Sequence, residues 1–461
     1  MIRCISPIDG SVYAERPTMS HDDALTAITR AQAAQMAWAL TPLETRIDLV
    51  LKGIENLGAT NDEIVPELAW QMGRPIRYGG EFGGVNERAS YMAKVASEAL
   101  APMQIENSNN FHRMIKRVPK GVVLVIAPWN YPYMTAINTV APALIAGNSV
   151  ILKHASQTPL VGERIARAFH EAGIGEDIFR NVFWDHDLTR DMIRARPLDD
   201  QVIRHVNFTG SVAGGQAMEQ AAAGTFASLG LELGGKDPGY VMQDADLDAA
   251  VDSLIDGAMF NSGQCCCGIE RIYVTEPLFD DFVAKAVEIV NGYILGNPLD
   301  AETTLGPMAQ PRFADLVRQQ TADAIAAGAK SHIDPARFPN DGGAYLMPQI
   351  LTGVTHDMDL MRVENFGPVV GIMPVKTEGE AIDLMNDSPY GLTASLWTQD
   401  PGRAERIGDQ LDTGTVFMNR CDYLDPALCW TGCKDTGKGE GLSVLGYHAV
   451  TRPKSYHLKK G

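Results

Sequence analysis

Two apolar segments in the first third of the chain restrict the folds that it can adopt. Residues 122–127 read Val-Val-Leu-Val-Ile-Ala and end at a proline, and residues 149–152 form a second apolar run. Apolar runs without alternation are typical of strands that are buried on both faces of a parallel sheet. The stretch 136–146 between them can form the crossover helix, and Gly147 suits its C-terminal cap. The spacing therefore predicts an α/β protein built on a parallel sheet.

A second strand and helix unit extends this sheet toward a glycine cluster. Residues 159–172 follow a helical pattern, 180–184 can form a strand, and 206–211 form a strand that runs into a turn. Gly210 and Ser211 begin the cluster and precede an alanine-rich helix, whose backbone amides could face a pyrophosphate. The cluster is not a G-x-G-x-x-G, so by itself a plain loop is the simpler interpretation. In its context it indicates a dinucleotide-binding sheet.

Composition and charge exclude several classes of protein. A chain of 461 residues, 45% of them hydrophobic, is long enough for two or three domains. Its formal net charge of -18 disfavours nucleic acid and anionic membrane as partners, because both require a positive face. No apolar run is long enough to span a bilayer, and an odd number of cysteines, seven, fits a reducing compartment. We therefore expect a cytoplasmic protein without nucleic-acid or membrane partners.

Three of the seven cysteines are adjacent, at positions 265–267 in the glycine-containing segment 260–267. They form neither an obvious disulfide framework nor the spacing of a zinc site. We hypothesise that one of these thiols is a nucleophile. The alternative for any one cysteine is that it is a small hydrophobic side chain buried in the core. The residues by themselves do not select among the three thiols.

Three motifs in order carry a resemblance to a known family. Residues 128–132 (Pro-Trp-Asn-Tyr-Pro), 231–236 (Leu-Glu-Leu-Gly-Gly-Lys) and the cysteine segment closely resemble signatures of the aldehyde dehydrogenase superfamily. Further matches extend over nearly the whole chain, at Lys153, 208–211, 364–368 and 389–392. The resemblance implies an NAD(P)-dependent enzyme that oxidises a small-molecule aldehyde to its carboxylic acid.

The resemblance also implies an aldehyde dehydrogenase-like α/β fold in three parts. A Rossmann-type cofactor-binding domain would comprise residues 1–101 and 121–233, and an α/β catalytic domain residues 234–447. A small β oligomerisation element would comprise residues 102–120 and 448–461. Its last strand resembles the edge strand that pairs with a neighbouring subunit in the family, so we expect a homodimer or a homotetramer.

The resemblance assigns three catalytic residues. The family nucleophile is the second residue after the glutamine, which is Cys266. Asn130 matches the amide that, with the backbone N–H of Cys266, stabilises the oxyanion. Glu232 matches the general base for the water that hydrolyses the thioester. Outside this context, Asn130 would be a turn residue and Glu232 a solvated loop charge.

Cofactor binding is assigned in the same way. The resemblance implies that Lys153 reaches the adenosine ribose and Glu364 the nicotinamide ribose, and further cofactor residues are Trp129, Gly210, Ser211 and Phe366. NAD-specific relatives commonly carry a glutamate three residues after the lysine, where this chain has Ser156. A hydroxyl does not repel a 2′-phosphate and can donate to it, so we expect NADP to be accepted. The alternative is that the serine at this position only weakens NAD binding.

The substrate end of the site is less specified. In relatives that oxidise succinate semialdehyde an arginine often stands where this chain has Asn138, which argues mildly against short ω-carboxy aldehydes. Arg420 is a candidate replacement, with a surface ion pair as the alternative. Asp422 and Asp425 would instead suit an amino aldehyde. The tunnel is expected to be apolar or aromatic, with Tyr131, Met134, Cys265, Cys267 and Trp430 near the substrate.

Two other functions and a metal site are disfavoured. A coenzyme A-acylating relative usually lacks the carboxylate at Glu232, and a non-catalytic binding member would have lost Cys266, Glu232 or Asn130. The C-terminal region contains a group of three cysteines, Cys421, Cys429 and Cys433. Their spacing is not that of a zinc module, so we expect no metal.

Overall fold

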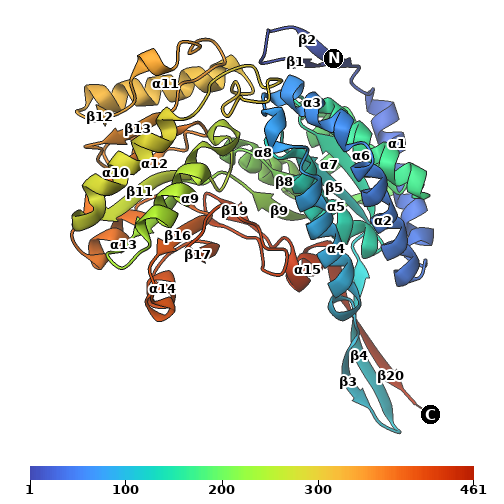
Figure 1. Cartoon of the computed structure of the whole chain (residues 1–461). Helices are drawn as coiled ribbons and strands as arrows, with labels where there is room; N and C mark the ends of the chain where they lie inside the picture. The colour runs from blue at the N-terminus through green and yellow to red at the C-terminus, as the bar shows by residue number, and fades with distance from the viewer. Residues whose placement is uncertain (461) are drawn as a thin grey trace.

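The computed structural model of the chain describes residues 1–460, which form two α/β lobes and a projecting β arm (Figure 1). The first lobe contains a six-stranded sheet in the order β19-β9-β8-β5-β6-β7, in which only β19 is antiparallel to its neighbour. Its strands are β5 (Val122–Ala127), β6 (Ser149–His154), β7 (Phe179–Asn181), β8 (Ile203–Thr209), β9 (Ser228–Glu232) and β19 (Gly437–Lys438).

Helices cover both faces of this sheet, which explains the uninterrupted apolar run in β5. Val123 and Val125 pack under one helical layer, and Val122 and Leu124 pack under the other. The first layer comprises α2 (Leu43–Gly58), α3 (Asn61–Met72), α4 (Phe82–Ala99), α5 (Pro132–Ile145) and α6 (Pro159–Ala172). The second comprises α1 (His21–Trp38), α7 (His186–Arg194) and α8 (Val212–Ala222).

Several boundaries differ from the sequence expectation. The crossover helix α5 begins at Pro132, before the expected 136, because proline is well suited to the first position of a helix. Strand β8 spans Ile203–Thr209, so Gly210 and Ser211 lie beyond it, and the Ser211 side chain caps α8. The α/β class and the parallel sheet are confirmed.

The second lobe contains a seven-stranded sheet in the order β12-β13-β14-β11-β10-β16-β17, parallel except for β12. Its strands are β10 (Asp237–Val241), β11 (Ile269–Thr275), β12 (Lys330–Ser331), β13 (Gln349–Thr352), β14 (Val369–Val375), β16 (Thr393–Trp397) and β17 (Thr415–Met418). Helices α9 (Leu247–Met259) and α10 (Glu276–Asn291) cover one face. The other face is covered by α11 (Pro311–Ala326), α12 (Asp359–Arg362), α13 (Glu378–Asn386) and α14 (Pro401–Gly408).

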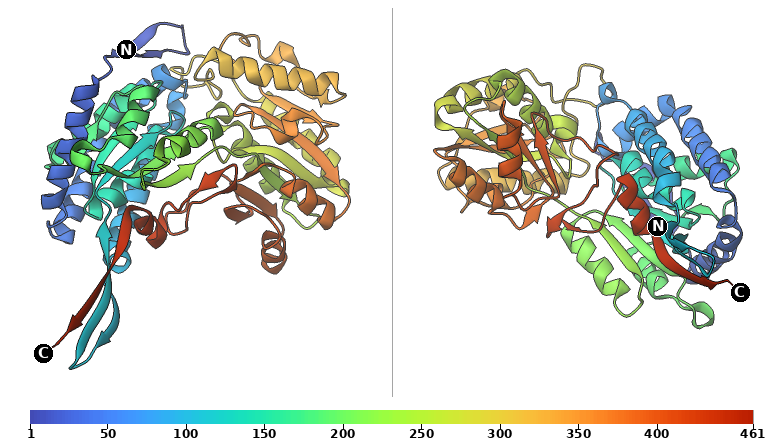
Figure 2. Two further views of the ribbon diagram at one scale, coloured as in Figure 1. Left: turned by 180° about the vertical axis from the view of Figure 1, so that it is seen from behind. Right: turned by 90° about the horizontal axis from the view of Figure 1, so that it is seen from below.

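The arm joins an early segment of the chain to its last strand. Strand β4 (Phe111–Pro119) pairs antiparallel with β3 (Met103–Asn107) and with β20 (Thr451–Lys459), which follows α15 (Ser443–Val450). The left view of Figure 2 shows this arm projecting away from both lobes. Smaller pairs are β1 (Ile2–Ile5) with β2 (Val12–Arg16) and β15 (Tyr390–Gly391) with β18 (Cys433–Lys434). None of the helices in the described part of the chain combines the length and apolarity needed to cross a membrane.

Candidate active site

The cysteine segment forms a constrained loop between α9 and β11. Asn261 and Ser262 have left-handed backbone conformations, with φ of 53° and 56°. Gly263 also has a positive φ, 71°, and a Cβ there would lie 2.2 Å from the carbonyl carbon of Gly367. The Gln264 side chain anchors the loop further, because its Oε1 accepts a hydrogen bond of 2.8 Å from the backbone of Ala309. Such strained backbone conformations persist only where surrounding contacts fix them. Here the strained loop positions Cys266.

Cys266 lies where two cavities meet. The first cavity, of about 290 Å³, is lined by Tyr131, Met134, Trp430 and all three adjacent cysteines. The second cavity, of about 300 Å³, is lined by Trp129, Asn130, Gly210, Ser211, Glu364 and Phe366. Cys266 and Glu232 belong to the walls of both cavities. A thiol in this position can react with a molecule in one cavity while a second molecule occupies the other.

The neighbouring thiols favour ionisation of Cys266. Hydrogen bonds with Cys265 and, to a smaller extent, with Cys267 lower the pKa of Cys266 well below its ordinary value. Burial opposes this shift. The same coupling, together with burial, raises the pKa of Cys265 and of Cys267. Because the thiolate is the nucleophilic form of cysteine, these hydrogen bonds favour Cys266 over the two flanking thiols as a nucleophile.

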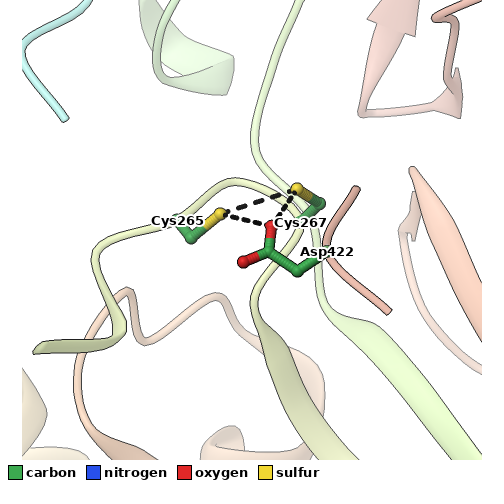
Figure 3. A group of neighbouring side chains, drawn as sticks. All are labelled: Cys265, Cys267 and Asp422. Atoms are coloured by element: carbon green, nitrogen blue, oxygen red, sulfur yellow. Dashed lines mark hydrogen bonds between the residues drawn. The ribbon is translucent and has the colours of Figure 1, made fainter. Parts of the chain in front are cut away.

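Asp422 holds the two flanking thiols, as Figure 3 shows. Its Oδ1 accepts hydrogen bonds from Cys265 Sγ at 3.2 Å and from Cys267 Sγ at 2.9 Å. Burial raises the pKa of Asp422 to about 7, an effect that these hydrogen bonds oppose. The ligand atoms of these three side chains lie within 4.8 Å of one another, as at a metal site, but here they satisfy one another as hydrogen-bond partners. Sequence reasoning did not find this contact, because Asp422 lies more than 150 positions from both thiols.

Glu232 is a partly buried carboxylate with a pKa near neutrality. It ends β9, opposite Thr209 of β8 and Gly437 of β19. Burial raises the pKa of Glu232 to about 7, and a 3.2 Å hydrogen bond from Thr209 Oγ1 partly opposes this shift. A carboxylate that titrates near pH 7 is suited to general-base catalysis.

Asn130 is buried in the loop between β5 and α5, and it lines the second cavity, as Cys266 does. Its backbone carbonyl accepts hydrogen bonds from Arg74 Nη2 at 2.5 Å and from Asn261 Nδ2 at 3.3 Å. The side-chain amide has no recorded hydrogen-bond partner among residues 1–460. It therefore remains available to an oxyanion that develops beside the thiol.

A buried ion pair connects this loop to the cysteine loop. Arg74 and Glu81 are paired at 2.5 Å, and both side chains are almost fully buried. Arg74 Nε also donates to Asn261, and Glu81 accepts the backbone N–H groups of Tyr133 and Met134 at the start of α5. Neither charged residue belongs to a motif identified in the sequence, and only their proximity in the fold reveals the pair.

The second cavity has the features of a nucleotide site. Gly210 and Ser211 stand at the N-terminus of α8, where backbone N–H groups favour a phosphate. Trp129 stacks on Phe313 with ring centroids 5.4 Å apart and meets Phe366 edge-on at 5.7 Å. Burial raises the pKa of Glu364 to about 8, and its Oε1 accepts the N–H of Gly235 at 3.1 Å.

The two predicted contacts to the adenosine end lie outside both cavity walls. Lys153 is near the end of β6 and is buried, which lowers the pKa of its ammonium. Ser156 is exposed in the loop between β6 and α6. Lys153 lies at the carboxyl end of this parallel strand and Ser156 just beyond it, which is where α/β sheets bind their ligands.

Arg420, the candidate anchor for an acidic substrate, lies outside the wall of the first cavity. Its side chain is exposed and does not line the first cavity; its guanidinium stacks on the ring of Tyr423, 3.9 Å from the centroid. Tyr423 lines the cavity instead and donates a hydrogen bond to Glu87. The arginine that does line the cavity is Arg88 of α4, which sequence reasoning missed because no motif contains it.

Comparisons with known proteins identify relatives of this chain over nearly its whole length. The model of the aldehyde dehydrogenase family matches residues 1–456. A succinate-semialdehyde dehydrogenase, NADP(+), of Deinococcus radiodurans is 31% identical, over 98% of this chain and 93% of that protein. A vanillin dehydrogenase of Corynebacterium glutamicum is 33% identical, over 94% of this chain and 89% of that protein. The crystal structure of a succinic semialdehyde dehydrogenase from Streptococcus pyogenes with NADP+ superimposes with a TM-score of 0.92, at 28% identity and with complete coverage of both chains.

Proposed function

This chain belongs to the aldehyde dehydrogenase family and oxidises an aldehyde to the carboxylic acid with NAD(P)+, and we propose that Cys266, Asn130 and Glu232 carry this reaction. The observation that supports the assignment most directly is the position of Cys266 and Glu232 in the shared wall of the two cavities. The coenzyme A-acylating alternative has no support among these relatives, and the retained triad argues against a non-catalytic member.

The first step uses the thiolate of Cys266. It attacks the aldehyde carbon from the wall of the first cavity and forms a thiohemiacetal. The Asn130 amide and the Cys266 backbone N–H donate to the resulting oxyanion. Trp129, Phe366 and Glu364 of the second cavity would hold the nicotinamide cofactor, which would supply the hydride acceptor for this carbon.

The second step uses Glu232. The acyl group is now a thioester on Cys266, and Glu232 removes a proton from the water that attacks it. Release of the acid restores the free thiol. Rapid acid quenching followed by mass spectrometry of the Cys266 peptide tests this scheme: a trapped acyl thioester supports it, and an acyl group on another residue would overturn it.

We propose that Ser156 permits NADP+ binding. A glutamate at this exposed position would repel the 2′-phosphate and would remove a hydroxyl donor. Ser156→Glu should lower the ratio of kcat/KM for NADP+ to that for NAD+ by roughly 10- to 100-fold. Ser156→Ala is the matched control, because it removes the donor without adding charge and should have a smaller effect. An unchanged ratio in Ser156→Glu would show that the 2′-phosphate binds elsewhere.

We further propose that the division into three domains has functional meaning. Residues 1–101 and 121–233 would hold the cofactor, 234–447 would supply the nucleophile, and 102–120 with 448–461 would join subunits. The arm carries exposed apolar side chains, with Met103 63% and Ile105 53% accessible, and apolar area exposed on an edge strand favours pairing with a second copy. Ile105→Asp should therefore shift the sedimentation of a homodimer or homotetramer toward the monomer; a wild-type chain that sediments as a monomer would refute the proposal.

A cytoplasmic location is also proposed. All seven cysteines are free in the structure, and the reaction requires one of them as a thiolate, which suits a reducing compartment. Cell fractionation would measure this directly.

A further inference from the structure

Arg88 places a buried positive charge in the wall of the first cavity. It lies on α4, and its side chain reaches α5, where Nη1 donates to Oδ1 of Asn138 at 3.1 Å. The residue is only 8% accessible. Its Nε has no hydrogen-bond partner in the described residues, and no carboxylate among them lies within 4.0 Å of its guanidinium.

Other buried arginines in this chain are compensated. Arg74 pairs with Glu81 at 2.5 Å. Arg271 donates to the carbonyls of Lys236 and Met385, among others, and Arg46 donates to the carbonyl of Ile145. Since a buried charge without partners is costly, proteins rarely retain one without a function. Arg88 is therefore an exception, and its location in a ligand cavity suggests that a ligand supplies the missing partner.

Two neighbouring donors of the Arg88 guanidinium lack partners in the described part of the chain, and together they have the shape of a carboxylate site. Nη1 is occupied by Asn138, whereas Nε and Nη2 share the opposite edge and have no recorded partner among residues 1–460. Two parallel N–H donors on one edge of an arginine bind both oxygens of a carboxylate. Asn138 orients the side chain so that this edge remains free.

The acidic residues of the cavity do not fill this role. Asp422 accepts the thiols of Cys265 and Cys267, and Glu87 accepts the hydroxyl of Tyr423 at 2.5 Å. Glu232, the third acidic residue of the cavity wall, accepts Thr209 Oγ1 at 3.2 Å and forms no ion pair with Arg88 within 4.0 Å. Burial raises the pKa of Asp422 to about 7, which reduces its repulsion of an anion near neutral pH. Because Asp422 is already engaged, the cavity also gives less support to an amino aldehyde.

We propose that Arg88, oriented by Asn138, binds a carboxylate group of the substrate, so that this enzyme oxidises aldehydes that carry a second, anionic carboxyl group. The proposal rests on the proposed function, because the aldehyde end must reach Cys266 in the same cavity. It differs from the sequence argument, in which the asparagine at position 138 leaves an acidic substrate without an anchor. The packing of α4 against α5 brings an arginine to that asparagine from a different helix.

A matched pair of substrates tests the proposal. The kcat/KM ratio of 4-oxobutanoate to butanal isolates the carboxylate, since the two aldehydes have the same chain length. Arg88→Gln should lower this ratio by roughly 100-fold. Arg88→Lys should restore only part of it, because an ammonium keeps the charge but loses the two-donor edge. Arg420→Gln is the matched control, since that arginine lies outside the cavity wall, and it should leave the ratio as in the wild type.

A binding measurement separates the anchor from the chemistry. Succinate should slow alkylation of Cys266 by iodoacetamide more than butyrate does, and Arg88→Gln should abolish the difference. One outcome is that butanal is oxidised while neither the kcat/KM ratio nor the protection of Cys266 by succinate depends on Arg88. In that case the role of Arg88 as a carboxylate anchor is wrong, and the proposed function stands. If succinate protects through Arg88 but neither aldehyde is oxidised, the anchor stands and the proposed function fails. Should Arg88→Gln not fold, a wild-type enzyme without preference for 4-oxobutanoate and without protection by succinate would overturn the proposal.

Discussion

Replacement of Cys266 by serine should reduce kcat by roughly 10⁴-fold or more, as expected when a covalent nucleophile is removed. Serine is nearly isosteric, but its hydroxyl does not ionise near neutral pH. The flanking thiols cannot replace it, because Cys265 and Cys267 donate to Asp422 and have raised pKa values. Steady-state formation of reduced cofactor measures the effect.

Cys433→Ser is the control for this experiment. Its thiol is also free and partly buried, but it lies outside both cavity walls and bonds backbone carbonyls. It should retain wild-type turnover. Substantial activity in Cys266→Ser would move the nucleophile to another residue and would remove the basis of the scheme.

Glu232→Gln should separate hydride transfer from hydrolysis. The first turnover should still produce reduced cofactor, whereas the steady-state rate should fall by roughly 10²- to 10⁴-fold, because the amide cannot accept a proton from water. The acyl thioester on Cys266 should therefore accumulate. Stopped-flow measurement of the burst and mass spectrometry of acid-quenched protein give the two readings. Loss of the burst together with turnover would instead place Glu232 in the first step.

The pH dependence provides an independent test of the same role. Burial raises the pKa of Glu232 from 4.5 to about 7, so the basic form dominates above pH 7 and the protonated, inactive form below it. Hydrolysis of the wild-type thioester should thus fall as the pH drops through 7, by about tenfold per unit once well below it. In Glu232→Gln this dependence should disappear. A wild-type hydrolysis rate that stays constant from pH 8 to about 5 would contradict the assignment.

The strand and helix pattern allowed much of the fold to be predicted. The run at 122–127 is apolar throughout because both faces of β5 are covered by helices, a property that local sequence encodes. Helix and strand boundaries were less accurate: α5 begins at Pro132, and β8 ends at Thr209. At such ends capping and neighbouring strands decide between conformations that are similar in local preference.

The sequence by itself determined the family, the fold class and the reaction, because ordered motifs around Asn130, Glu232 and Cys266 encode chemistry in short segments. The tertiary structure decided which groups surround these motifs. Asp422 reaches the flanking thiols, and Arg88 reaches Asn138, across separations of more than 150 and of 50 positions. Such contacts arise from the packing of whole helices and loops, so no local pattern predicts them. For the same physical reason, the aldehyde that this enzyme prefers depends on side chains that only the folded chain brings together.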